Sequence, residues 1–173
     1  MDPMSEDDRA GLAKLAEMID EARIAMLTTL EPGGALRSRP LATLQVDPEG
    51  CIWFFTAESS PKVGEMQQHR EVNLSYADAD EQDYVSVSGT AELVHDRAKM
   101  QQLWTPWVKA WFPNGLDDPD LALLKVRIDS AEYWDAPSST VRRLYGLAKA
   151  LATGDHGALG EHGRLSGGAP PHG

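Results

Sequence analysis

The stretch "DYVSVSGTAELV", residues 83 to 94, has the clearest alternation of apolar and polar residues in the chain. Its apolar side chains fall on one side of an extended backbone: Val85, Val87, Ala91 and Leu93. Its polar side chains fall on the other side: Tyr84, Ser86, Ser88 and Thr90. Because side chains alternate between the two faces of a strand, this period of two predicts a half-buried β-strand.

Five further stretches predict strands of comparable length. They are "RIAMLTTL" (23–30), "ALRSRPLATLQV" (35–46), "CIWFFTA" (51–57), "VNLSYAD" (72–78) and "LALLKVRIDSAEYWD" (121–135). The turn "EPGG" joins the first two into a hairpin. Six strands at short spacing favour a closed antiparallel barrel over a doubly wound sheet. The expected fold class is therefore mainly β (α+β), with peripheral helices.

Three short helices are predicted around these strands. The first carries Leu12, Leu15 and Ile19 on one face and begins near Ser5. A second begins at Ser60 and Pro61, and a third follows Asp96. We expect residues 1–151 to form one domain. Residues 152–173 are rich in glycine and histidine and predict a flexible tail, because they offer little apolar surface to offset ordering entropy.

Composition excludes several classes of partner. The chain of 173 residues has a formal net charge of -11, which argues against nucleic acid and against an anionic membrane surface. Cys51 is the only cysteine, so an internal disulfide and a thiolate zinc cluster are both excluded. Residues 1–11 are acidic and do not resemble a signal peptide. These features predict a cytoplasmic protein.

Two arginines on the second predicted strand are candidates for binding an anion. Arg37 and Arg39 are two residues apart and therefore project from the same face. Arginine forks suit phosphate geometry. Pro40 indicates that this strand lies at a sheet edge or at a bulge. The alternative is a pair of exposed arginines that bridge surface carboxylates.

The stretch "IWFFTAESSPKVGEM", residues 52–66, supplies a second candidate. A helix that begins at Pro61 directs free N–H groups and its positive dipole end at an anion, beside Ser59, Ser60 and Lys62. Considered alone, this stretch is more often a capped helix with a solvated lysine. Beside the arginine strand, it suggests a phosphate site, and the strand end "FTA" would bring backbone amides to a ligand ring.

The sequence gives little support for nucleophilic catalysis or for metal binding. Cys51 is expected to be a buried structural thiol, and the isolated His69 and His95 are expected to be structural or surface residues. Metal capture by the tail histidines would be loose, so no metal site is predicted. Three tryptophans lie at near-helical spacing and favour a core or dimer face over a cofactor site: Trp104, Trp107 and Trp111.

The order of these motifs resembles the general stress protein branch of the pyridoxamine 5'-phosphate oxidase-like family, whose fold is a six-stranded antiparallel split β-barrel. The resemblance covers approximately residues 8–136. It implies a homodimer that binds flavin mononucleotide (FMN), with flavin adenine dinucleotide (FAD) as an alternative, in a groove between the subunits. The implied flavin-binding positions are Arg37, Ser38, Arg39, Pro40, Phe55, Thr56, Ser59, Ser60, Lys62, Tyr84 and Trp134.

The resemblance also implies roles for individual positions. Arg39 and Lys62 match residues that hold the flavin phosphate, while Phe55 and Thr56 match the strand end whose backbone meets the flavin ring. Tyr84 matches a polar contact with the flavin. Trp134 matches an aromatic residue near the cofactor, and Arg37 is the weaker candidate of the two arginines.

Two departures from the oxidases bear on activity. Leu44 stands where the oxidases carry a lysine, and "TVRRLYGLAKA" (140–150) does not reproduce their arginine, histidine and arginine signature. We therefore do not expect pyridoxamine 5'-phosphate oxidase activity. The leading hypothesis is a flavin-dependent oxidoreductase that acts on a small molecule with a reduced nicotinamide or similar donor, its catalytic residues unknown.

Two alternatives remain at this point. One is a non-catalytic flavin-binding store, sensor or partner-binding module in the stress response. The other keeps the same barrel and replaces FMN by a deazaflavin or a tetrapyrrole.

Overall fold

A single antiparallel sheet forms the centre of the molecule in the computed structural model, which describes residues 5–135 and 161–166. Within these residues the strands are β1 (Ile24–Leu30), β2 (Leu36–Ala42), β3 (Gln45–Val46), β4 (Cys51–Ala57), β5 (Glu71–Asp78), β6 (Asp83–Val94), β7 (Leu121–Asp135) and β8 (Glu161–Ser166). The helices are α1 (Glu6–Ala22), α2 (Pro61–Gln68), α3 (Arg97–Leu103), α4 (Pro106–Trp111) and the short 3₁₀ helix η1 (Gly115–Asp117). The mainly β prediction is confirmed.

The hydrogen-bonded sheet runs in the order β2-β1-β5-β6-β7-β4-β3, and β8 pairs with β7. The spacing of the predicted strands favoured a barrel closed by hydrogen bonds. The sheet is not closed in this way, because among the described strands β2 and β3 form the two ends of the path. The chain itself bridges the opening: Thr43 N–H donates to the Arg23 carbonyl, and Leu44 N–H donates to the Trp53 carbonyl, at 2.9 Å each. The predicted strand 35–46 is therefore two strands, one on each side of a split barrel.

β4 separates two apolar clusters. Every side chain from Cys51 to Thr56 is buried. Ile52 and Phe54 belong to the larger cluster, which also includes the buried side chains of α1. Cys51, Trp53 and Phe55 face a second cluster formed with α3 and α4. The prediction of a buried cysteine is confirmed, and burial is the main reason that the pKa of Cys51 is raised.

β6 has the alternation that its sequence predicts. Val85, Val87 and Ala91 are buried, whereas Tyr84, Ser88 and Glu92 are exposed. A bulge interrupts its pairing with β7 between Ser88 and Gly89. β2 lies at a sheet end, as Pro40 indicated, because proline cannot donate to a second neighbouring strand.

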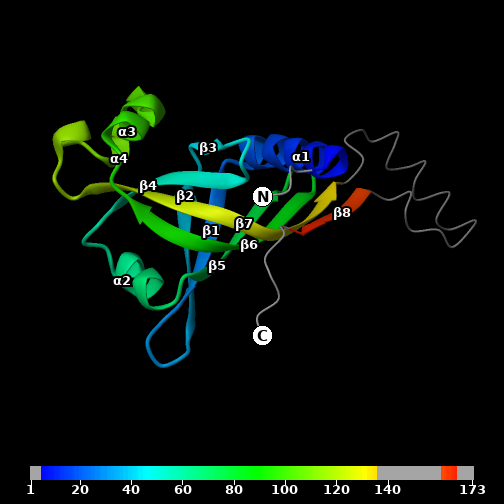
Figure 1. Ribbon diagram of the computed structural model, residues 1–173, viewed down its shortest axis with the longest axis horizontal. Helices are drawn as coiled ribbons and strands as arrows, with labels where there is room; N and C mark the ends of the chain where they lie inside the picture. Colours follow the sequence, from blue (N-terminus) through cyan, green and yellow to red (C-terminus); the bar gives the residue numbers. More distant parts are fainter. Residues whose placement is uncertain (1–4, 136–160, 167–173) are drawn as a thin grey trace, which may run out of the picture.

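The helices lie at the two ends of the sheet (Figure 1). α1 lies near β3 and β8, and α2 lies near the ends of β4 and β5, on the same side of the view as α3 and α4. The expected starts of α1, α2 and α3 are confirmed, with Ser5, Ser60 and Asp96 at the cap positions. No helix in the described ranges is long and apolar enough to span a membrane.

β8 was not predicted from the sequence. It lies within residues 152–173, the expected tail, and pairs with β7 from Ser130 to Asp135. The rest of that segment lies outside the described residues, so the domain boundary at residue 151 stays a prediction.

Candidate functional site

The sequence places a lysine and a serine at the beginning of α2. Ser60 occupies the cap position and Pro61 begins the helix, as expected for an N-terminus of this kind. The Ser60 hydroxyl makes no capping bond to the helix backbone. It instead accepts a hydrogen bond of 2.8 Å from Lys62 Nζ. The lysine is therefore held beside the first turn of the helix.

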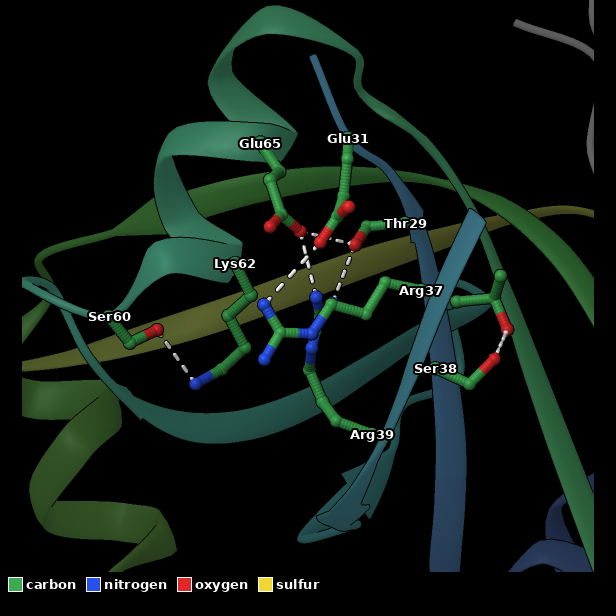
Figure 2. Close-up of polar contacts among 9 residues, drawn as sticks. Thr29, Glu31, Arg37, Ser38, Arg39, Ser60, Lys62 and Glu65 are labelled. Atoms are coloured by element: carbon green, nitrogen blue, oxygen red, sulfur yellow. Dashed lines mark hydrogen bonds and ion pairs between the residues drawn. The ribbon is translucent and has the colours of Figure 1, made fainter. Parts of the chain in front are cut away.

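Arg39 is held by a buried polar network beside this helix (Figure 2). One terminal nitrogen of Arg39 donates to Thr29 Oγ1 at 2.5 Å, and the other donates to Glu65 Oε2 at 2.8 Å. Thr29 Oγ1 in turn donates to the same Glu65 oxygen at 2.6 Å. Thr29 comes from β1, Arg39 from β2 and Glu65 from α2, so the network fixes α2 to the first hairpin.

The network shifts the pKa of Glu65, and its charges also affect the pKa of Lys62. The hydrogen bond from Thr29 is the main reason that the pKa of Glu65 is lowered, and Arg39 adds to this effect against the opposing effect of burial. The pKa of Lys62 is also lowered, mainly by burial and then by the nearby charge of Arg39, while Glu65 acts in the opposite direction. Glu65 is thus ionised at neutral pH, and two cations lie close enough to affect each other.

Arg37 and Arg39 share a face of β2, as predicted, because they stand opposite Thr29 and Leu27 of β1. Their environments differ. Arg37 is 56% exposed and lies 3.4 Å from Glu31, which is the surface pairing that the sequence left open for both arginines. Arg39 is only 17% exposed. Of the two, Arg39 is the one that the fold holds in a fixed position.

Ser38 and Ser59 point to partners outside this cluster. Ser38 projects from the opposite face of β2, where its hydroxyl lies 2.6 Å from that of Thr28. The Ser59 hydroxyl donates to Asp120 at 2.7 Å. Figure 2 shows Ser38 pointing away from Arg39 and Lys62. The Ser59 hydroxyl is likewise engaged elsewhere, by Asp120.

A cavity of about 310 Å³ lies beside Lys62. Its volume is within the range of small-molecule sites in proteins. The end of β4 contributes Phe55, Thr56 and Ala57 to its wall, and β2 contributes Pro40. The remaining lining residues are apolar or aromatic: Ile24, Leu41, Ala42, Leu44, Trp107, Val108, Trp111 and Phe112. The cavity therefore has a cationic edge and a broad apolar wall.

The α4 helix supplies the two tryptophans of this wall. Trp107 and Trp111 contact each other with ring centroids 6.2 Å apart, and they remain 42% and 67% exposed. Trp104, by contrast, packs edge-on against Phe55. Trp104 is partly buried against the second cluster, as the core alternative predicted, whereas Trp107 and Trp111 line the cavity and are exposed. The dimer-face alternative for these residues stays a prediction.

Tyr84 and Trp134 lie elsewhere in the same chain. They are paired with each other, close to the beginning of β6 and the end of β7. Thr56, at the cavity, is paired with Ala122 near the other end of β7. One copy of the chain therefore does not bring Tyr84 and Trp134 to the cavity that contains Lys62.

Comparison with known proteins identifies the family. The sequence pattern of the family described as "Pyridoxamine 5'-phosphate oxidase like" matches residues 10–157. The chain belongs to this family. Among curated proteins it is similar to protein bli-3 of Neurospora crassa, with 27% identity over 150 residues that cover 81% of this chain and 72% of the relative.

Solved structures of the family have the same split-barrel fold. A protein of Jannaschia sp. assigned as general stress protein 26 is 29% identical, with a TM-score of 0.74 over 91% of this chain and 99% of that one. The general stress FMN/FAD binding protein of Xanthomonas citri is also 29% identical, with a TM-score of 0.64 over 78% of this chain and 93% of that one.

Several residues around the site were not predicted from the sequence: Thr29, Glu65, Asp120 and most of the apolar side chains that line the cavity. Glu65 follows Lys62 by three positions in α2, so helical spacing alone could have placed it beside the lysine. Asp120 is distant in sequence from the loop that it binds, and no local pattern indicates that contact. Within the described ranges, no group of histidine, cysteine, aspartate and glutamate residues could hold a metal ion.

Proposed function

We propose that this family member binds FMN, or FAD by its FMN portion, in the cavity beside Lys62. The observation that carries the proposal is the division of the cavity: a lysine on one side and an apolar, partly aromatic wall on the other. This division suits a ligand with an anionic group and a flat ring. The Xanthomonas citri relative, a general stress FMN/FAD binding protein, supports the same ligand.

The residues present fit the cofactor. Lys62 and Arg39 would hold the phosphate, with Ser60 fixing the lysine and Glu65 fixing the arginine. The backbone at Phe55 and Thr56 would face the ring, since their side chains are buried in the protein. The apolar wall would exclude water from the ring. Bound flavin would supply electron and hydride transfer, and the protein would bind and orient it.

We also propose a homodimer with the site at the subunit interface. The outer face of β1 and β2 carries only uncharged side chains: Ile24, Met26, Thr28, Leu36, Ser38, Pro40 and Ala42. Strand pairing continues this face through Ser75 and Ser86 toward Tyr84 and Trp134. Ile24, Pro40 and Ala42 also line the cavity, so the cavity opens at the rim of the face. A second copy on this face could bring its Tyr84 and Trp134 to the flavin.

The proposed activity is a cytoplasmic flavin-dependent oxidoreduction of a small molecule in a general stress response. Lys62 is the only cavity-lining residue of the described chain with an ionisable side chain, and the proposal assigns it to the phosphate. Redox chemistry would therefore depend on the flavin itself. This distinguishes the proposal from acid–base catalysis by the protein.

The test is a flavin-binding and turnover experiment. Purified protein is incubated with FMN, desalted and examined by absorption spectroscopy, and we expect retained flavin at one per subunit. A protein that stays colourless would overturn the binding proposal. The spectrum of the native complex also separates FMN from a deazaflavin or a tetrapyrrole. Flavin that binds but is not reduced by NADH or NADPH and reoxidised at catalytic rates would favour a store or sensor instead.

A further inference from the structure

Glu65 is a buried carboxylate at the edge of the proposed phosphate position. Its side chain is 7% exposed, and one oxygen accepts hydrogen bonds from both Thr29 and Arg39. Glu65 lies on the same helix as Lys62, three residues later, and neighbours at this spacing share a helix face. An acidic residue is the least expected neighbour for a site that attracts an anion. Its burial and its two bonds show that the fold places it there.

The charges around Glu65 nearly balance. Arg37, Arg39 and Lys62 are positive, and Glu31 and Glu65 are negative, so one net positive charge remains (Figure 2). The two carboxylates differ in position. Glu31 pairs with the exposed Arg37 at 3.4 Å, whereas Glu65 pairs with the largely buried Arg39 at 2.8 Å. Water screens the first pair more than the second.

We propose that Glu65 is a positioning residue that aims the guanidinium of Arg39 at the anion and limits the positive charge of the phosphate site. This inference rests on the proposed function, because the anion in question is the flavin phosphate. In the network each terminal nitrogen of Arg39 uses one N–H for Thr29 or Glu65. A guanidinium carries five N–H donors, so others remain for a phosphate.

The charge limit has a consequence for selectivity. A site with excess positive charge would bind inorganic phosphate and other small anions from the cytoplasm. By opposing that charge, Glu65 makes tight binding depend on contacts with the ring as well as with the phosphate. Removal of the Glu65 charge should therefore strengthen the binding of phosphate groups and leave the binding of the ring alone unchanged.

The test compares four proteins: wild type, Glu65→Gln, Glu65→Ala and the matched control Glu31→Gln. Glutamine keeps an oxygen that can accept both hydrogen bonds, and it removes the charge. Alanine removes the charge and the anchor of Arg39 together. The probe is inorganic phosphate, followed by NMR of the Lys62 side chain, so this measurement does not require flavin. The dissociation constants of FMN and riboflavin are measured in parallel.

We expect Glu65→Gln to bind inorganic phosphate roughly fivefold or more tightly at low salt, the size expected for one charge a few ångströms from an anion in a partly hydrated site. Glu31→Gln should change the affinity for inorganic phosphate less. Glu65→Ala should gain less than Glu65→Gln, because Arg39 is no longer held. Riboflavin binding should be equal in wild type and Glu65→Gln.

Each outcome decides one claim. Phosphate binding that is equal or weaker in Glu65→Gln, or undetectable in both proteins, overturns the charge limit. Equal phosphate binding by the glutamine and alanine variants overturns the positioning role. If no protein binds FMN while the phosphate result is as expected, the proposed flavin function fails and the role of Glu65 stands.

Discussion

The carboxylate of Asp120 accepts two hydrogen bonds from Ser59, one from its backbone N–H at 2.8 Å and one from its hydroxyl at 2.7 Å. The neighbouring Glu58 N–H donates to the Asp120 carbonyl at 2.8 Å. These bonds join the loop before α2 to the residue before β7. The position of Lys62 relative to the strand end at Thr56 therefore depends on a residue that is remote in sequence.

Asp120→Asn should destabilise this loop in a pH-dependent way. The hydrogen bond from the Ser59 side chain is the main reason that the pKa of Asp120 is lowered. A carboxyl with a lowered pKa stabilises the folded state above its unfolded pKa, about 3.9, and this contribution is lost as pH falls through the folded value. We expect the variant to have a lower Tm at pH 7 and the difference to shrink near pH 3. An equal difference at both pH values would contradict this assignment.

Arg39→Ala and Lys62→Ala should each weaken FMN binding by roughly 1.5 to 3 kcal/mol, the range for loss of a charge-assisted hydrogen bond. Arg37→Ala is the matched control, because Arg37 lies on the same strand face but is exposed and paired with Glu31. Its effect should be smaller. Titration followed by flavin fluorescence measures the FMN dissociation constant of all three variants. Unchanged affinity in both Arg39→Ala and Lys62→Ala would refute the phosphate assignment.

Met26→Asp should disrupt the proposed dimer. Met26 is exposed in the middle of the uncharged face of β1 and β2, opposite Pro40. A buried aspartate without a partner is costly, so the variant should become monomeric and lose flavin, while its fold is retained. Light scattering and circular dichroism measure these outcomes. Gln101→Asp, at an exposed position in α3 outside this face, is the control and should change neither. A wild-type monomer that binds flavin fully would contradict the interface proposal.

The local features of the fold were predictable because each depends on neighbouring residues. The alternation in β6 and the serine, proline and lysine at the start of α2 are visible in sequence and lie where expected. The break between β2 and β3 was not predictable, because Thr43 and Leu44 form bonds to residues remote in sequence, Arg23 and Trp53. β8 was missed since its glycine-rich stretch lacks a strand pattern.

In the candidate site, too, local features were predictable and features that depend on contacts remote in sequence were not. Shared orientation of Arg37 and Arg39 follows from strand periodicity, but their different burial depends on where α2 packs. The bond of Ser59 to Asp120 likewise depends on tertiary structure. Sequence order indicated which residues could bind a phosphate, and packing determined which of them are held in place.

Trp107→Ala and Trp111→Ala should weaken the binding of both FMN and riboflavin. The two side chains form the exposed aromatic wall of the cavity, so their contribution should be to the ring and not to the phosphate. We expect a loss of about 1 to 3 kcal/mol for either ligand, as is typical when an aromatic ring loses a stacking surface. Trp→Phe at each position should restore most of the affinity. Loss for FMN alone would contradict a role in ring binding.

Gly89→Ala should destabilise the barrel, because the β6 bulge brings Gly89 close to β7. A Cβ atom at Gly89 would lie 2.5 Å from the Arg127 carbonyl oxygen and 2.7 Å from Val126 Cγ1. Relief of such contacts requires the strand backbone to move, at a typical cost of about 1 to 3 kcal/mol. Gly64→Ala in α2 is the matched control, since its Cβ would meet no atom within 4 Å. That change should stabilise the protein by up to about 1 kcal/mol. Urea denaturation of both variants measures the difference, and equal midpoints would contradict the steric role of Gly89.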